Sequence, residues 1–83
     1  MEKKLIFHYD AGHGWLEVKA SELVRLGIAD KISAYSYKRG GKAYLEEDCD
    51  APLYIKTSGI SNDQITDKSD GDESSIRNFE QYR

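Results

Sequence analysis

The chain has 83 residues, of which 39% are hydrophobic and 33% are charged, and its formal net charge is −3. A chain of this length forms one domain and buries only about 60% of its unfolded surface. Basic and acidic side chains balance over residues 1–60, so the negative charge lies in residues 61–83. This distribution argues against a general DNA- or RNA-binding protein, which needs a basic face.

Alternation of apolar and polar residues predicts strands in four segments: residues 3–9, 15–19, 34–38 and 42–46. Residues 10–14 form a turn between the first two strands, because their glycines permit positive φ and the Asp10 side chain can accept bonds from nearby amides. Residues 39–41 contain two glycines and form the turn between the last two strands. Connections this short predict two antiparallel hairpins.

Two short helices are expected, one after each hairpin. Ser21 is a favoured N-cap residue, and Gly27 ends the apolar stripe that follows it. Asp48 or Asp50 is expected to cap the second helix, which Gly59 ends. Helices of about two turns depend on packing against a sheet for their stability.

Residues 1–60 are therefore predicted to form a compact α+β domain, in which an antiparallel sheet of about four strands carries two short helices on one face. Residues 61–75 are rich in polar and acidic side chains, so we expect a mobile acidic segment. Residues 76–83 regain aromatic side chains. Phe79 and Tyr82 lie three residues apart, which suggests a C-terminal tail that docks on the domain.

His8, Asp10 and His13 could provide three metal ligands, and two imidazoles with one carboxylate are common in catalytic metal sites. The interpretation we favour is simpler. His8 is a strand residue exposed to solvent, and His13 is a turn residue between glycines. A small metal-binding protein or enzyme at these three residues is therefore an alternative, and we assign no metal or other cofactor.

Four carboxylates lie close together in the sequence: Glu46, Glu47, Asp48 and Asp50. They lack the glycine and the spacing of a calcium-binding loop. Helix capping and surface solvation are their ordinary roles, and contact with a basic partner is the alternative, because adjacent carboxylates pair with arginines. Cys49 lies among them. Negative neighbours disfavour a thiolate, so a catalytic cysteine is not expected.

Tyr35 and Tyr37 lie near Arg39 on the second predicted hairpin. Aromatic rings beside basic side chains can stack nucleobases, so a single-strand nucleic-acid-binding module is a further alternative. Aromatic side chains on neighbouring strands more often pack within the sheet. We favour packing in the sheet, together with a role in a protein-binding face.

Residues 10–16 (DAGHGWL), 26–33 (LGIADKIS) and 44–50 (YLEEDCD) resemble a family of small accessory proteins encoded by phages, plasmids and related mobile elements. The resemblance covers residues 5–55 and returns at residues 76–79. The family offers no catalytic residues that can be transferred to this chain. It implies a genetic setting in which many small proteins bind and disable host defence machinery.

We therefore expect a non-enzymatic inhibitor of a bacterial defence system, similar to anti-CRISPR proteins and acting in the host cytoplasm. Its partner would be a host protein, such as a nucleic-acid-binding defence complex, rather than a membrane or nucleic acid itself. The single cysteine excludes an internal disulfide, and the apolar runs are too short for a secretion signal or a membrane span. The residues expected to contact the partner are His13, Trp15, Tyr35, Tyr37, Glu46, Glu47, Asp48 and Asp50.

Overall fold

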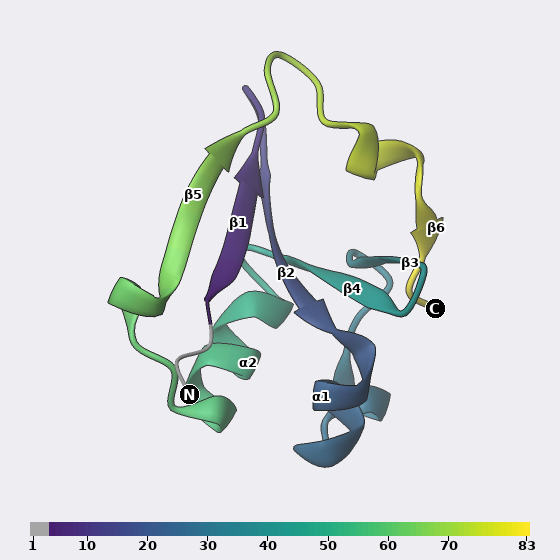
Figure 1. Cartoon of the computed structure of the whole chain (residues 1–83). Helices are drawn as coiled ribbons and strands as arrows, with labels where there is room; N and C mark the ends of the chain where they lie inside the picture. The colour runs from purple at the N-terminus through teal and green to yellow at the C-terminus, as the bar shows by residue number, and fades with distance from the viewer. Residues whose placement is uncertain (1–3) are drawn as a thin grey trace.

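The computed structural model describes residues 4–83, which form an α+β domain (Figure 1). Within these residues, six strands make one mixed sheet in the order β5-β1-β2-β4-β3-β6. The elements, with short 3-10 turns labelled η, are β1 (Leu5–Tyr9), β2 (Gly14–Lys19), α1 (Ala20–Arg25), η1 (Ala29–Lys31), β3 (Tyr37–Arg39), β4 (Lys42–Glu46), α2 (Asp50–Ser58), η2 (Asn62–Gln64), β5 (Ile65–Ser69), η3 (Ser75–Asn78) and β6 (Glu80–Gln81). The two predicted antiparallel hairpins are confirmed as β1–β2 and β3–β4, although β3 runs from Tyr37 to Arg39 and not over residues 34–38.

The sheet is larger than the four strands predicted. Strand β5 lies parallel to β1, with Ile65 opposite Leu5 and Ser69 opposite Tyr9. It lies in the segment that was predicted to be mobile. The sequence did not indicate a strand there, because four of its five residues are exposed and the apolar alternation of a half-buried strand is missing. Strand β6 has only two residues and pairs with β3 at the other edge.

Both helices end as predicted, but α1 does not begin as predicted. Gly27 follows α1 and Gly59 follows α2, with φ of +73° and +74°, which is the left-handed geometry that glycine adopts at helix ends. Lys19 is the N-cap residue of α1, and no side-chain hydrogen bond caps that end. Ser21 instead lies inside the first turn of the helix.

The main core lies between one face of the sheet and the two helices. Leu16 pairs with Leu45 across β2 and β4, and Val18 pairs with Ala43, so these four side chains share that face. The buried residues of the core are Leu16, Val18, Leu23, Ile28, Ile32, Ala43, Leu45, Ala51 and Tyr54. Each large apolar side chain buried here contributes about 1.5–3 kcal/mol relative to exposure. Among residues 4–83, no helix is long and apolar enough to span a bilayer.

The C-terminal segment, residues 70–83, covers the opposite face of the sheet with residues 70–79. It continues into the edge strand β6, and Tyr82 packs against the main core. Trp15 and Tyr44 point to that opposite face, because their neighbours Leu16 and Leu45 point to the core. The Phe79 ring packs edge-on against Tyr44, with 5.1 Å between the ring centroids. Ile76 is 2% exposed. In Figure 1 this segment descends from the top of β5 to β6, away from the helices.

Gly14 is required by the packing of the first hairpin. A Cβ atom at Gly14 would lie 2.3 Å from Cζ of Phe7 and 3.3 Å from the His8 carbonyl oxygen. Gly14→Ala is therefore expected to lower the free energy of unfolding by about 1–3 kcal/mol, the usual cost of overpacking. Urea unfolding measures this loss. The loss should be smaller in a Phe7→Ala background, and an equal loss in both backgrounds would contradict the steric explanation.

Candidate functional site

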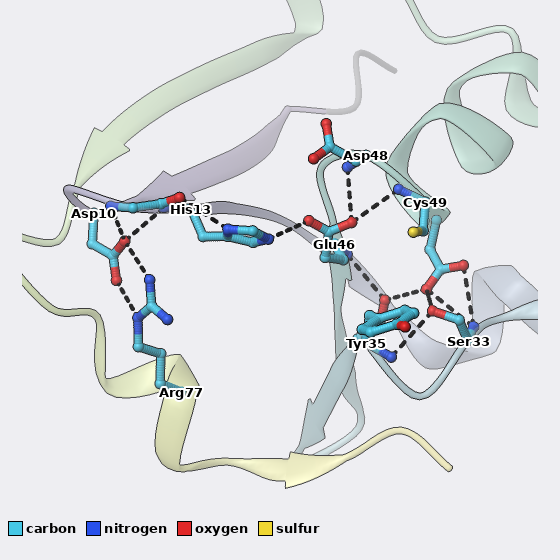
Figure 2. Close-up of polar contacts among 11 residues, drawn as sticks. Asp10, His13, Ser33, Tyr35, Glu46, Asp48, Cys49 and Arg77 are labelled. Atoms are coloured by element: carbon cyan, nitrogen blue, oxygen red, sulfur yellow. Dashed lines mark hydrogen bonds and ion pairs between the residues drawn. The ribbon is translucent and has the colours of Figure 1, made fainter.

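The β1–β2 turn is built around the Asp10 carboxylate, which is fully buried. Its Oδ1 accepts hydrogen bonds from the amides of Gly12 and His13, each at 2.9 Å. Its Oδ2 accepts from the Ser74 amide at 2.8 Å and from Arg77 Nε at 2.7 Å. The Arg77 guanidinium, above all, holds the pKa of Asp10 well below its usual range. Asp10 therefore joins the turn to the C-terminal segment (Figure 2).

The predicted ligand set of His8, Asp10 and His13 is not assembled. His8 points to the face covered by the C-terminal segment, where its Nε2 lies 2.8 Å from Glu17 Oε1 and its Nδ1 lies 3.4 Å from Asp70 Oδ1. Asp10 is occupied by Arg77 and by backbone amides. The three side chains thus bind three separate sets of partners.

His13 instead connects the β1–β2 turn to the end of β4. Its Nε2 lies 2.5 Å from Glu46 Oε2, and its Nδ1 lies 2.9 Å from the Gly12 carbonyl oxygen (Figure 2). The Gly12 carbonyl first, and Glu46 after it, raise the pKa of His13 against the opposing effect of partial burial. Both ring nitrogens face acceptors, so the protonated imidazolium suits this position.

The Glu46 side chain is buried and is held in place by backbone hydrogen bonds. Its side chain is only 5% exposed. Its Oε1 accepts hydrogen bonds from the amides of Asp48 and Cys49, each at 2.9 Å. Two fixed donors on one oxygen leave Oε2 directed at His13. Four donor side chains therefore meet where β4 ends beside the β1–β2 turn. Their ligand atoms all lie within 4.8 Å of one another, and the residues are His13, Glu46, Glu47 and Asp48.

An open hollow of about 440 Å³ adjoins this cluster, and we call it the acidic hollow; its lining residues are Phe7, Tyr9, Asp10, Ala11, Gly12, His13, Glu47 and Asp67. It lies on the helix-bearing face of the sheet, because Asp67 pairs with Phe7 and Phe7 with Leu16. Figure 1 shows that the upper ends of β1 and β5 extend beyond the helices. Tyr9 is 42% exposed. Glu47 is half-buried and Asp67 is exposed, and both line this hollow.

Of the eight residues expected to contact a partner, three are buried and five reach the surface. Trp15, Glu46 and Asp50 are buried, with exposures of 2%, 4% and 3%, so a partner would meet their neighbours rather than these side chains. Tyr35 is 70% exposed. The other residues that reach the surface are His13, Tyr37, Glu47 and Asp48.

Sequence reasoning missed two residues of the acidic hollow, Tyr9 and Asp67. Tyr9 carried a usable signal, because it shares a strand face with Phe7 and yet stands at the end of the strand. Asp67 carried none, because it lies in a strand that shows no apolar alternation.

The aromatic face proposed for single-stranded nucleic acid is largely occupied within the chain. Tyr37 packs edge-on against Trp15, with 6.3 Å between ring centroids. The Arg39 guanidinium lies 5.0 Å from the centre of the Phe79 ring. Tyr37 and Arg39 are therefore engaged within the chain, whereas Tyr35 is exposed.

Comparison of the chain with models of protein families, with curated proteins and with solved structures found no match.

Proposed function

We propose that this chain is a non-enzymatic protein-binding module of a mobile genetic element, and that it inhibits a bacterial defence system in the manner of an anti-CRISPR protein. Its residue pattern resembles accessory proteins of such elements. The observation that carries the proposal is the acidic hollow, where the carboxylates of Glu47 and Asp67 lie beside the exposed ring of Tyr9.

The acidic hollow fits a basic side chain of a partner protein. Carboxylates bind a guanidinium through charge-assisted hydrogen bonds, which are about twice as strong as neutral ones. The Tyr9 ring adds a cation–π contact of about 0.5–2 kcal/mol. Proteins that bind nucleic acid place arginines and lysines along the groove that holds the phosphates. A module that occupies those side chains would keep nucleic acid out of the groove.

The chemistry of the cysteine and histidine side chains favours a binding role over a catalytic one. Partial desolvation, with the carboxylates of Glu46 and Asp50, raises the pKa of the Cys49 thiol and keeps it protonated. A protonated thiol is a poor nucleophile. The Gly12 carbonyl and the Glu46 carboxylate raise the pKa of His13 and stabilise its imidazolium form, which cannot act as a general base.

Neutralising the acidic hollow is expected to abolish capture of the partner. The test variant combines Glu47→Gln and Asp67→Asn, which line the hollow, with Asp48→Asn in the turn beside it. A control variant with the same net charge combines Asp30→Asn, Asp72→Asn and Glu80→Gln, which are exposed elsewhere on the chain. Tagged protein is incubated with nuclease-treated lysates of defence-bearing bacteria, and captured proteins are identified by mass spectrometry. The wild type and the control should retain a nucleic-acid-binding defence protein, which the test variant should lose by at least about tenfold.

Two results would contradict the proposal. The wild type could retain no defence component from any of several defence-bearing hosts. Alternatively, both triple variants could lose the partner equally, which would indicate a non-specific charge effect instead of a site at the acidic hollow.

A further inference from the structure

We propose that His13, Glu46, Glu47 and Asp48 form a binding site for one first-row divalent cation. The site brings together two turns that are distant in the sequence, one before β2 and the other after β4. Its donor set is mixed, since one imidazole joins three carboxylates whose ligand atoms all lie within 4.8 Å of one another. Metal binding is a separate property from partner binding, and it is measured with the chain alone.

The His13 ring is oriented as a metal ligand. Its Nδ1 lies 2.9 Å from the Gly12 carbonyl oxygen, to which it donates a hydrogen bond. Histidines that bind metals usually donate the second ring N–H to a backbone carbonyl or a carboxylate, which fixes the tautomer. On metal binding the Nε2 proton is released to solvent, and the hydrogen bond from Nδ1 then leaves Nε2 as the ligand atom, directed at Glu46.

Glu46 provides a second ligand atom that is already in place. Its Oε1 is held by two backbone amides, and Oε2 lies 2.5 Å from His13 Nε2. Two ligands bound to one cation at about 2.0–2.2 Å are themselves about 3 Å apart. His13 is 42% exposed and lies on a turn, so a ring movement of less than about 1 Å would open the space for the cation.

Glu47 and Asp48 complete the donor set from the more exposed side. Glu47 and His13 also line the acidic hollow, which offers an entry path and room for water ligands. Imidazole with carboxylates suits Mn²⁺ and Zn²⁺, whereas Mg²⁺ and Ca²⁺ prefer oxygen ligands alone. Zn²⁺ and Mn²⁺ are therefore the expected cations.

Titration calorimetry with ZnCl₂ and MnCl₂ on the full chain, purified without a histidine tag, tests the proposal. One cation should bind per chain, and MgCl₂ should bind at least about tenfold more weakly. His13→Gln should weaken binding by at least about tenfold. The chain has two histidines, so His8→Gln is the matched control and should bind as the wild type does.

A second variant protects the test against a folding defect at His13. Glu47→Gln combined with Asp48→Asn changes partly and fully exposed side chains, and it should also weaken binding by at least about tenfold. The proposal is overturned if the wild type binds neither cation, since the cluster would then hold only the His13–Glu46 ion pair. It is also overturned if His8→Gln removes binding, or if neither variant of the cluster changes the affinity.

Discussion

Asp10→Asn is expected to detach the C-terminal segment from the sheet. The Asp10 carboxylate accepts two bonds from Arg77, at 2.7 and 2.9 Å, and one from the Ser74 amide. An asparagine would turn an NH₂ donor toward the guanidinium or toward these amides, and it would remove the charge that Arg77 needs. Arg77, whose side chain is 38% exposed, then loses its buried counter-ion, and the charge-assisted bonds that hold the C-terminal segment to the turn are weakened.

Trp15 reports this detachment directly, because it is the single tryptophan of the chain. Its ring is 2% exposed and lies 5.2 Å from the Arg77 guanidinium carbon. In Asp10→Asn its fluorescence should shift to the red, and the amides of Ile76 and Phe79 should lose protection in hydrogen exchange. The control is Glu80→Gln in the same C-terminal segment, which removes an exposed ion pair with Lys38 of β3. It should leave both signals unchanged.

The same contact predicts a dependence on pH. Because the folded pKa of Asp10 lies below the unfolded value of about 3.9, its stabilising contribution is complete above that value and is lost as the pH falls. Trp15 fluorescence should therefore begin to shift to the red as the pH falls below about 4. In Asp10→Asn the shift should already be present at pH 7. A wild-type stability that falls no more steeply below about pH 4 than that of Asp10→Asn would contradict the role of Asp10.

Local patterns predicted the parts of the fold that local interactions determine. Strand β4 was predicted with its observed bounds, Lys42–Glu46, because it follows a turn of two glycines and its residues alternate. Strand β5 could not be predicted in this way. It pairs in parallel with β1, about 60 residues earlier in the chain, and its exposed side chains carry no apolar signal for that pairing.

Local patterns in the sequence also could not predict the candidate site. His8, Asp10 and His13 are close in the sequence, but His8 contacts Glu17 and Asp70, and Asp10 binds a residue 67 positions away. His13 and Glu46 are brought together because Trp15 pairs with Glu46 in the sheet. The sequence supplied both partners of that contact separately. Only the register of β2 against β4 shows that they meet.

Asp50→Ala is expected to lower the free energy of unfolding substantially. The sequence suggested a helix cap, yet the N-cap residue of α2 is Cys49, and Asp50 binds a distant loop instead. Its carboxylate accepts bonds from the Ser33 amide and hydroxyl, the latter at 2.6 Å, and from the Ser36 hydroxyl at 2.5 Å. Ser36 in turn accepts a bond from the Glu46 amide at 3.0 Å.

Alanine at position 50 would leave the Ser36 hydroxyl and the Ser33 amide without their acceptor inside the protein. Each unsatisfied buried group costs about 1–3 kcal/mol, so the expected loss is about 2–5 kcal/mol. Small domains have total stabilities near the lower end of about 5–15 kcal/mol, so much of the protein should unfold at 37 °C. Urea unfolding followed by circular dichroism measures the loss.

Asp48→Ala is the matched control, because Asp48 is exposed and carries the same charge two residues earlier. In metal-free buffer it should cost no more than about 0.5 kcal/mol. Asp50→Asn should lie between the two, because its amide oxygen keeps one acceptor for Ser36. Equal losses for Asp50→Ala and Asp48→Ala would mean that the hydrogen bonds of Asp50 add nothing to stability. The ordered series would instead show that Asp50 couples α2 to β4, and hence that the position of Glu46 beside His13 depends on a residue outside the site.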